Sequence, residues 1–211
     1  MNISHKYKFV WTAPPKVGSR TTKNIFRKHC DLNPDWPSED HPTDFTHANE
    51  WPDGANDDYL HITSVRHPYY RWVSYWKYAQ NDNNELKRLG TDPLTALLEM
   101  DENWFFAWTC HQISVNTNTR IDYVIHAETF IEDIRSLPFM PDDYELDVAW
   151  VGKTYVPVGQ FWDEQQLRDE VYKRFKVDYD YFGYGKDDVF DIWDVKQRTA
   201  SRPTQNFPTK L

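Results

Sequence analysis

Residues 7–29 read YKFVWTAPPKVGSRTTKNIFRKH, and their pattern points to the fold class. Its opening YKFVWT is rich in β-forming residues and predicts a strand, which ends before Pro14 and Pro15 because proline lacks a backbone donor. A short loop follows, and residues 21–29 then predict a helix with a pair of apolar side chains that can face a sheet. The stretch is therefore predicted to be a strand, a turn and a helix in direct succession.

Strands and helices continue to alternate beyond this stretch. Residues 59–65 (YLHITSV) and 121–126 (IDYVIH) predict two further strands, and Pro68 suits the first turn of a helix over residues 69–79. Apolar spacing predicts more helices after Asp92-Pro93, around Phe130, Ile131 and Ile134, and around Leu167, Val171 and Phe175. Such alternation favours a single α/β domain with a mostly parallel central sheet flanked by helices.

The length and the local composition indicate one domain and a tail. A chain of 211 residues fits a single domain. We assign residues 1–185 to this domain, and the charged, proline-containing residues 186–211 to a tail that wraps the surface or is partly disordered. Residues 30–58 are rich in proline and aspartate, so we expect irregular structure between the first two predicted strands.

Charge and composition exclude several classes of function. The formal net charge of −9 repels nucleic acid and anionic membranes, so any anion site has to be local. Residues 1–10 contain no apolar run of signal-peptide length, and no stretch approaches the roughly 20 apolar residues of a membrane span, so we expect a soluble, cytoplasmic protein. The two cysteines, Cys30 and Cys110, form no Cys-x-x-Cys motif, and the histidines form no His-x-His or His-x-x-x-His pair, so no metal site is predicted.

The first strand-to-helix junction, residues 16–22 (KVGSRTT), has the composition of a phosphate-binding loop. Amides at the helix N-terminus and the helix dipole favour an anion, Gly18 lets the backbone approach it, and Lys16 can neutralise a bridging oxygen. The junction is P-loop-like in kind, but its lysine precedes the glycine, whereas the nucleotide-triphosphatase loop has its lysine after the last glycine. Taken alone, the segment also fits an ordinary turn capped by Ser or Thr.

The second junction, residues 65–74 (VRHPYYRWVS), places an Arg-x-Pro-x-x-Arg-x-x-Ser run at the end of a strand. Arg71 and Ser74 share a face of the predicted helix. Arg66 stands at the strand edge, so that Arg66 and Ser74 can share one phosphate. The alternative is that Pro68 only starts a helix and the arginines pair with acidic neighbours.

Together the two junctions resemble the sulfotransferase family. The first is similar to that family's 5′-phosphosulfate loop and the second to its 3′-phosphate motif, in the same order along the chain. The resemblance covers residues 7–184 and is closest to the carbohydrate sulfotransferases of the Golgi type, through residues 122–133 (DYVIHAETFIED) and 172–184 (YKRFKVDYDYFGY). Arg20 departs from the family pattern, which usually has a small residue at this position.

The resemblance implies an enzyme that moves the sulfuryl group of 3′-phosphoadenosine 5′-phosphosulfate (PAPS) to a hydroxyl or amine of a glycan or small metabolite. The product would be adenosine 3′,5′-bisphosphate, and no metal is required. Lys16 is the natural cation for the leaving phosphate, because negative charge develops there during transfer. The residues that we assign to the donor are Lys16, Gly18, Ser19, Arg20, Thr21, Thr22, Arg66, Ser74 and Lys153.

A hydroxyl acceptor also needs a base, and histidine suits this role near neutral pH. His47 lies between the two junctions, where a resemblance to the histidine-using 2-O-type sulfotransferases implies the base. Asp44 and Glu50 are the carboxylate alternatives. His67, inside the second junction, is expected to shape the phosphate motif rather than to transfer protons.

Two other classes of function remain open from the sequence. A small kinase uses the same helix-terminus physics, but it would carry a lysine after the last loop glycine and an acidic metal ligand. A non-catalytic carbohydrate-binding or interaction protein is supported by the high aromatic content of 10 Trp, 13 Tyr and 12 Phe. For an acceptor, an acidic protein suits a neutral glycan or a small metabolite better than a polyanion. The sequence predicts no oligomeric state.

Overall fold

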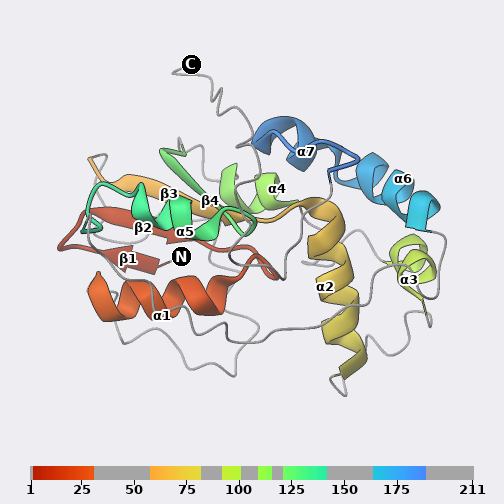
Figure 1. Cartoon of the computed structure of the whole chain (residues 1–211), viewed down its shortest axis with the longest axis horizontal. Coiled ribbons are helices and arrows are strands. Elements are labelled where there is room, and N and C mark those ends of the chain that lie inside the picture. Colours follow the sequence, from red (N-terminus) through yellow and green to blue (C-terminus); the bar gives the residue numbers. More distant parts are fainter. Residues whose placement is uncertain are drawn as a thin grey trace.

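The computed structural model describes the chain over residues 2–30, 58–81, 92–100, 109–115, 121–141 and 164–188. A four-stranded sheet in the order β1-β2-β3-β4 lies at its centre (Figure 1). The strands are β1 (Asn2–Ser4), β2 (Phe9–Thr12), β3 (Leu60–Val65) and β4 (Tyr123–His126). β2, β3 and β4 run parallel, and β1 is antiparallel to β2. The predicted α/β class with a mostly parallel sheet is confirmed.

The register of the parallel strands brings their carboxyl ends to one edge of the sheet. Thr12, at the end of β2, is paired with Thr63 of β3. Val65, at the end of β3, is paired with His126 at the end of β4. β-branched and aromatic residues fill these strands and most are buried, as expected for strands that are covered on both faces. The two predicted junctions therefore follow neighbouring strands at the same edge.

Helices follow the strands as predicted, with small differences in their bounds. The described helices are α1 (Ser19–His29), α2 (Pro68–Asn81), α3 (Pro93–Glu99), α4 (Cys110–Val115), α5 (Phe130–Arg135), α6 (Glu164–Arg174) and α7 (Lys176–Phe182). α1 begins directly after Gly18, two residues earlier than predicted. The short elements β1 and α7 were not predicted, because their few residues give no clear periodicity. None of the helices in these ranges is long and apolar enough to cross a membrane.

One apolar cluster joins the sheet to α1 and α5. The fully buried Phe26 of α1 packs against Phe9 and Trp11 of β2, with ring centroids 5.1 and 5.4 Å apart. Phe130 and Ile134 of α5 belong to the same cluster, as the predicted apolar face of that helix requires. Large aromatic side chains contribute strongly to core stability, so this cluster fixes α1 and its N-terminus against the sheet.

A second apolar cluster joins α2, α3, α6 and α7, which lie beside the sheet in Figure 1. The predicted stripe of Leu167, Val171 and Phe175 is buried; its first two residues lie in α6, and Phe175 lies between α6 and α7. Two polar contacts add to the packing: Nε1 of Trp72 donates to the Pro93 carbonyl at 2.9 Å, and Nη1 of Arg174 donates to the Leu97 carbonyl at 2.8 Å. These helices form a block that adjoins the sheet edge carrying the junctions, because Val65 at the end of β3 belongs to the same cluster.

Candidate active site

The first junction is open at the N-terminus of α1. Gly18 is the N-cap residue with a φ of 86°, a left-handed conformation that glycine adopts without strain. Among the residues that the structure describes, no heavy atom beyond its chain neighbours lies within 4 Å of the place where a Cβ would stand, and the first turn of α1 contains no acidic residue. The alternative of a turn capped by Ser or Thr does not hold, because the N-cap residue is Gly18, which has no side chain to cap the helix. The geometry suits an anion that approaches the helix amides.

The other residues assigned to this loop differ in exposure. Arg20 is exposed and Ser19 is half-buried, whereas Thr21 and Thr22 are buried. The Thr22 hydroxyl donates to the Gly18 carbonyl at 3.4 Å, and the Thr21 amide donates to the same carbonyl at 3.1 Å. The two threonines therefore stabilise the first turn of α1, and Arg20 is the long cation that faces solvent at this end.

Lys16 has an uncommon backbone conformation. Its φ is 68°, in the left-handed region that non-glycine residues rarely adopt and that costs about 1 to 3 kcal/mol. Nη1 of Arg66 donates to the Lys16 carbonyl at 3.3 Å. Because Arg66 directly follows β3, this bond connects the second junction to the first. Sequence reasoning assigned Arg66 to a phosphate and did not predict this contact, since the two residues are 50 positions apart.

Arg71 makes the second contact from α2 to the loop. Its Nε donates to the Pro15 carbonyl at 3.1 Å, and its Nη1 lies 3.9 Å from Oδ2 of Asp178, with both side chains buried. Asp178 in turn accepts the backbone amides of Cys110 and His111 at 2.8 and 2.7 Å. Burial raises the pKa of the Asp178 carboxyl, and Arg71 and the two amides oppose that rise. For Arg71, the alternative of an arginine that pairs with an acidic residue therefore holds.

The two residues predicted to read a 3′-phosphate lie just before α2 and within it. Arg66 is half-buried and comes just before the helix, and Ser74 lies within the helix, one turn after Arg71. Ser74 keeps 8% of its surface exposed. The structure thus places both residues in one strand-to-helix segment, and a phosphate that they share stays a prediction.

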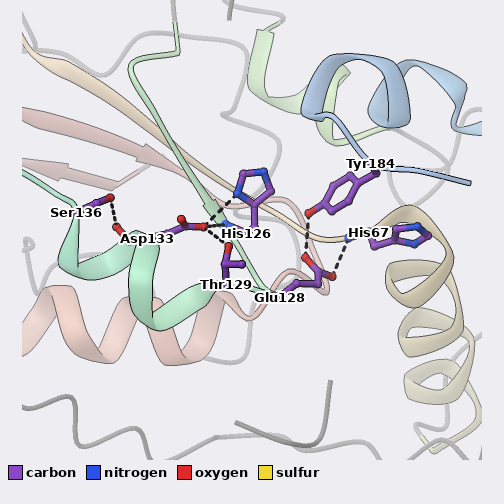
Figure 2. A network of polar contacts seen from close by, with 7 residues as sticks. All are labelled: His67, His126, Glu128, Thr129, Asp133, Ser136 and Tyr184. Carbon is purple, nitrogen blue, oxygen red and sulfur yellow. Dashed lines mark hydrogen bonds and ion pairs between the residues drawn. The ribbon is translucent and has the colours of Figure 1, made fainter. Parts of the chain in front are cut away.

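His67 connects the second junction to the C-terminal segment. Its Nε2–H donates to the Gly185 carbonyl at 3.0 Å, and its ring contacts the rings of Tyr179 and Tyr184 edge-on. Its backbone amide donates to Oε1 of Glu128 at 3.0 Å, and Oε2 of Glu128 accepts the Tyr184 hydroxyl at 2.9 Å (Figure 2). Burial lowers the pKa of His67 and raises the pKa of Tyr184. His67 is a buried support of the loop, as its place in the motif predicted.

A second carboxylate fixes the end of β4 to α5. Oδ2 of Asp133 accepts the His126 amide at 2.8 Å and the Thr129 hydroxyl at 2.8 Å, and it lies 3.1 Å from Nδ1 of His126 (Figure 2). Glu128 and Asp133 were missed as site residues. The sequence feature that could have identified them is that both are acidic residues within 122–133, the stretch that carries the family resemblance.

Several predicted site residues lie outside the described residues. They are His47 with its alternatives Asp44 and Glu50, and the donor residue Lys153. Most of the predicted tail, residues 189–211, also lies outside. In the part of the chain that the structure describes, no three His, Cys, Asp or Glu side chains gather in a group that could hold a metal.

Comparison with known proteins points to one family. A model described as "Sulfotransferase family" matches residues 1–137, which include both junctions, β4 and α5. No curated protein and no solved structure matches the chain significantly. The matched part stops before α6 and α7, so the contacts of Asp178 and Gly185 come from outside it.

We predict that His67 makes the stability of the protein depend on pH. Because burial lowers the pKa of His67, the unfolded chain takes up a proton near pH 6.5 while the folded chain does not. The free energy of unfolding should therefore fall as the pH drops below about 6.5, by at most about 1.4 kcal/mol per pH unit. His67→Gln keeps a donor toward Gly185 but cannot titrate, so its stability should change less between pH 7.5 and pH 5.5 in urea unfolding.

The same replacement at the exposed His5 controls for the introduction of glutamine. Equal pH slopes for the wild type and His67→Gln would show that His67 does not titrate differently in the folded protein.

Proposed function

The chain belongs to the sulfotransferase family, and from this premise we propose that it transfers the sulfuryl group of PAPS to a hydroxyl or amine of a glycan or small metabolite. The observation that carries the proposal is the contact between two anion loops at one sheet edge. They follow the parallel neighbours β2 and β3, and Nη1 of Arg66 donates to the Lys16 carbonyl at 3.3 Å. One donor with phosphates at both ends of its ribose fits such a pair of loops.

The first junction would hold the 5′ end of the donor. When bound, PAPS supplies a sulfuryl group on a phosphate that leaves readily. The open N-terminus of α1 at Gly18 can receive that phosphate, with Ser19, Thr21 and Thr22 in the same turn. Lys16 can neutralise the charge that develops on the leaving oxygen. Arg20, exposed beside this end, can add a contact to the same phosphate.

The second junction would read the 3′-phosphate, the group that distinguishes PAPS from ATP. Arg66 supplies a guanidinium and Ser74 a hydroxyl, and charge-assisted bonds of this kind are the strong ones. Since Arg66 also contacts the Lys16 carbonyl, recognition at the 3′ end is linked to the loop at the 5′ end.

The remaining assignments rest on the family resemblance. His47 is proposed as the base that takes the acceptor proton, with Asp44 or Glu50 as alternatives, and Lys153 as a further donor contact. The net charge of −9 favours a neutral glycan or small metabolite over a polyanionic acceptor. We assign the activity to residues 1–185 and treat residues 186–211 as a tail, with no metal, nucleic acid or membrane as partner.

Lys16→Ala should reduce turnover at least about 100-fold, because the lost charge acts where negative charge develops, a contribution on the order of 3 kcal/mol. Turnover is followed with PAPS labelled in its sulfur and a mixture of glycans and metabolites as acceptors. Affinity for adenosine 3′,5′-bisphosphate, measured by calorimetry, should fall much less. Lys28→Ala, at the exposed far end of α1, is the matched control. Near-full turnover of Lys16→Ala would remove the phosphosulfate-loop assignment.

Arg66→Ala should weaken binding of the donor and reduce the preference for a nucleotide that carries a 3′-phosphate. Loss of a charge-assisted phosphate contact costs roughly 1.5 to 3 kcal/mol, and Ser74→Ala should cost less. Calorimetry compares adenosine 3′,5′-bisphosphate with adenosine 5′-phosphate, and the preference for the bisphosphate should shrink in both variants. Arg27→Ala, on the exposed side of α1, controls for the lost charge. An unchanged preference in Arg66→Ala would contradict the 3′-phosphate role.

His47→Asn should separate turnover from donor binding. Loss of a positioned base lowers the rate by about 10² to 10⁴. Affinity for adenosine 3′,5′-bisphosphate should stay within about threefold, because the base does not touch the phosphates. Asp44→Asn and Glu50→Gln are measured beside it. If His47→Asn retains turnover and one carboxylate variant loses it, the base is that carboxylate.

A further inference from the structure

The ammonium of Lys16 lies over the ring of Tyr78. Its Nζ is 4.2 Å from the ring centroid, well within the roughly 6 Å over which a cation is attracted to an aromatic face. Lys6 approaches the ring of its neighbour Tyr7 to 4.8 Å, and Lys176 approaches Tyr172 only to 5.7 Å. The approach to Tyr78 is the shortest of these three lysine contacts, and it joins the loop to α2.

The backbone contacts of the loop fix the direction from which the Lys16 side chain starts. Lys16 has a φ of 68°, and its carbonyl and that of Pro15 accept hydrogen bonds from Arg66 and Arg71. Lys16 and Tyr78 are both half-buried, so the contact is partly shielded from water. The backbone contacts fix the start of the Lys16 side chain, and the Tyr78 ring holds its end, so the side chain has fewer conformations open to it.

Tyr78 also lies on the side of α2 that adjoins the loop. It follows Ser74 by one helical turn, so the two residues share a face of the helix. One hollow is lined by Lys16 of the loop together with Arg71, Trp72 and Tyr75 of α2. The lysine therefore runs along α2, and its ammonium ends at Tyr78.

We propose that Tyr78 is a positioning residue for Lys16: its ring holds the ammonium beside the phosphate loop before the donor arrives. The inference rests on the proposed function, in which Lys16 acts on the leaving phosphate. A lysine side chain has several rotatable bonds, and ordering it during the reaction lowers the rate. If the ring orders the lysine before the reaction, part of that cost is removed. Loss of the ring should therefore lower turnover and leave donor affinity largely unchanged.

The contact itself is tested by NMR without any assumption about function. In protein labelled with ¹³C at the lysine ε-carbon, the Lys16 signal is identified by its loss in Lys16→Ala. Protons over an aromatic face are shifted upfield, so the Lys16 ε-protons should be upfield in the wild type and in Tyr78→Phe. They should return to the ordinary lysine position in Tyr78→Leu. An ordinary position in the wild type would overturn the proposal.

The positioning role is tested by turnover with labelled PAPS and by calorimetry with adenosine 3′,5′-bisphosphate. Tyr78→Leu should lower turnover about three- to tenfold, the range expected for a contact of this kind, while bisphosphate affinity stays within about threefold. Tyr78→Phe keeps the ring and should retain turnover within about twofold. Tyr172→Leu removes a different ring that contacts lysines, on α6, and should leave both turnover and the Lys16 signal unchanged.

The outcomes separate this proposal from the proposed function. If the wild type neither binds the bisphosphate nor transfers sulfur, the proposed function fails and the positioning role fails with it. If the wild type is active and Tyr78→Leu turns over equally fast, only the positioning role is wrong. Equal losses in Tyr78→Phe and Tyr78→Leu would also overturn it, because the hydroxyl and not the ring would then be responsible. Thermal unfolding of each variant shows whether a loss reflects the fold, and a folded Tyr78→Leu protein with slowed turnover supports the proposal.

Discussion

The guanidinium of Arg71 contacts the Pro15 carbonyl on one side and the Asp178 carboxylate on the other, and the geometry of the first loop depends on it. A buried ion pair adds little net stability, because removing the charges from water costs about as much as their attraction returns. The contribution of this ion pair is to hold the Arg71 guanidinium in place beside the loop. Arg71 fixes the carbonyl just before Lys16, so the uncommon backbone of that lysine is held by contacts that a shift of the loop would break.

The second loop depends on the same C-terminal part of the chain through a different carboxylate. Glu128 accepts the His67 amide and the Tyr184 hydroxyl, and the His67 ring donates to the Gly185 carbonyl. The segment after α6 therefore contacts the second junction directly, at Arg71 through Asp178 and at His67 through Gly185, and it reaches the first loop only by way of Arg71 and the Pro15 carbonyl. This gives a physical reason for a Tyr- and Asp-rich stretch at residues 172–184, which the family resemblance had only pointed out.

Local patterns predicted the parts of the fold that local physics determines. β-forming runs predicted β2 and β3, Pro68 predicted the start of α2, and apolar side chains predicted one face of α1 and of α6. The two loops were found because glycine, lysine and hydroxyl residues have to adjoin a helix N-terminus. The positive φ of Lys16 was not predictable, because a lysine rarely adopts this conformation. The contact of Arg71 with Asp178 was not predictable either, since no local pattern relates residues 107 positions apart. The base and Lys153 stay predictions because they lie outside the described residues.

The dependence of both loops on residues 178–185 has a consequence for synthesis of the protein. The ribosome delivers residues 1–137 first, and these carry every part of the two loops themselves. The bonds from Asp178 and Gly185 to Arg71 and His67 form only after α7 has emerged. A nascent chain therefore carries the aromatic residues of α2 uncovered by α6 and α7, where chaperones can bind them. The proposed donor site is therefore completed only after residues 178–185 have been synthesised.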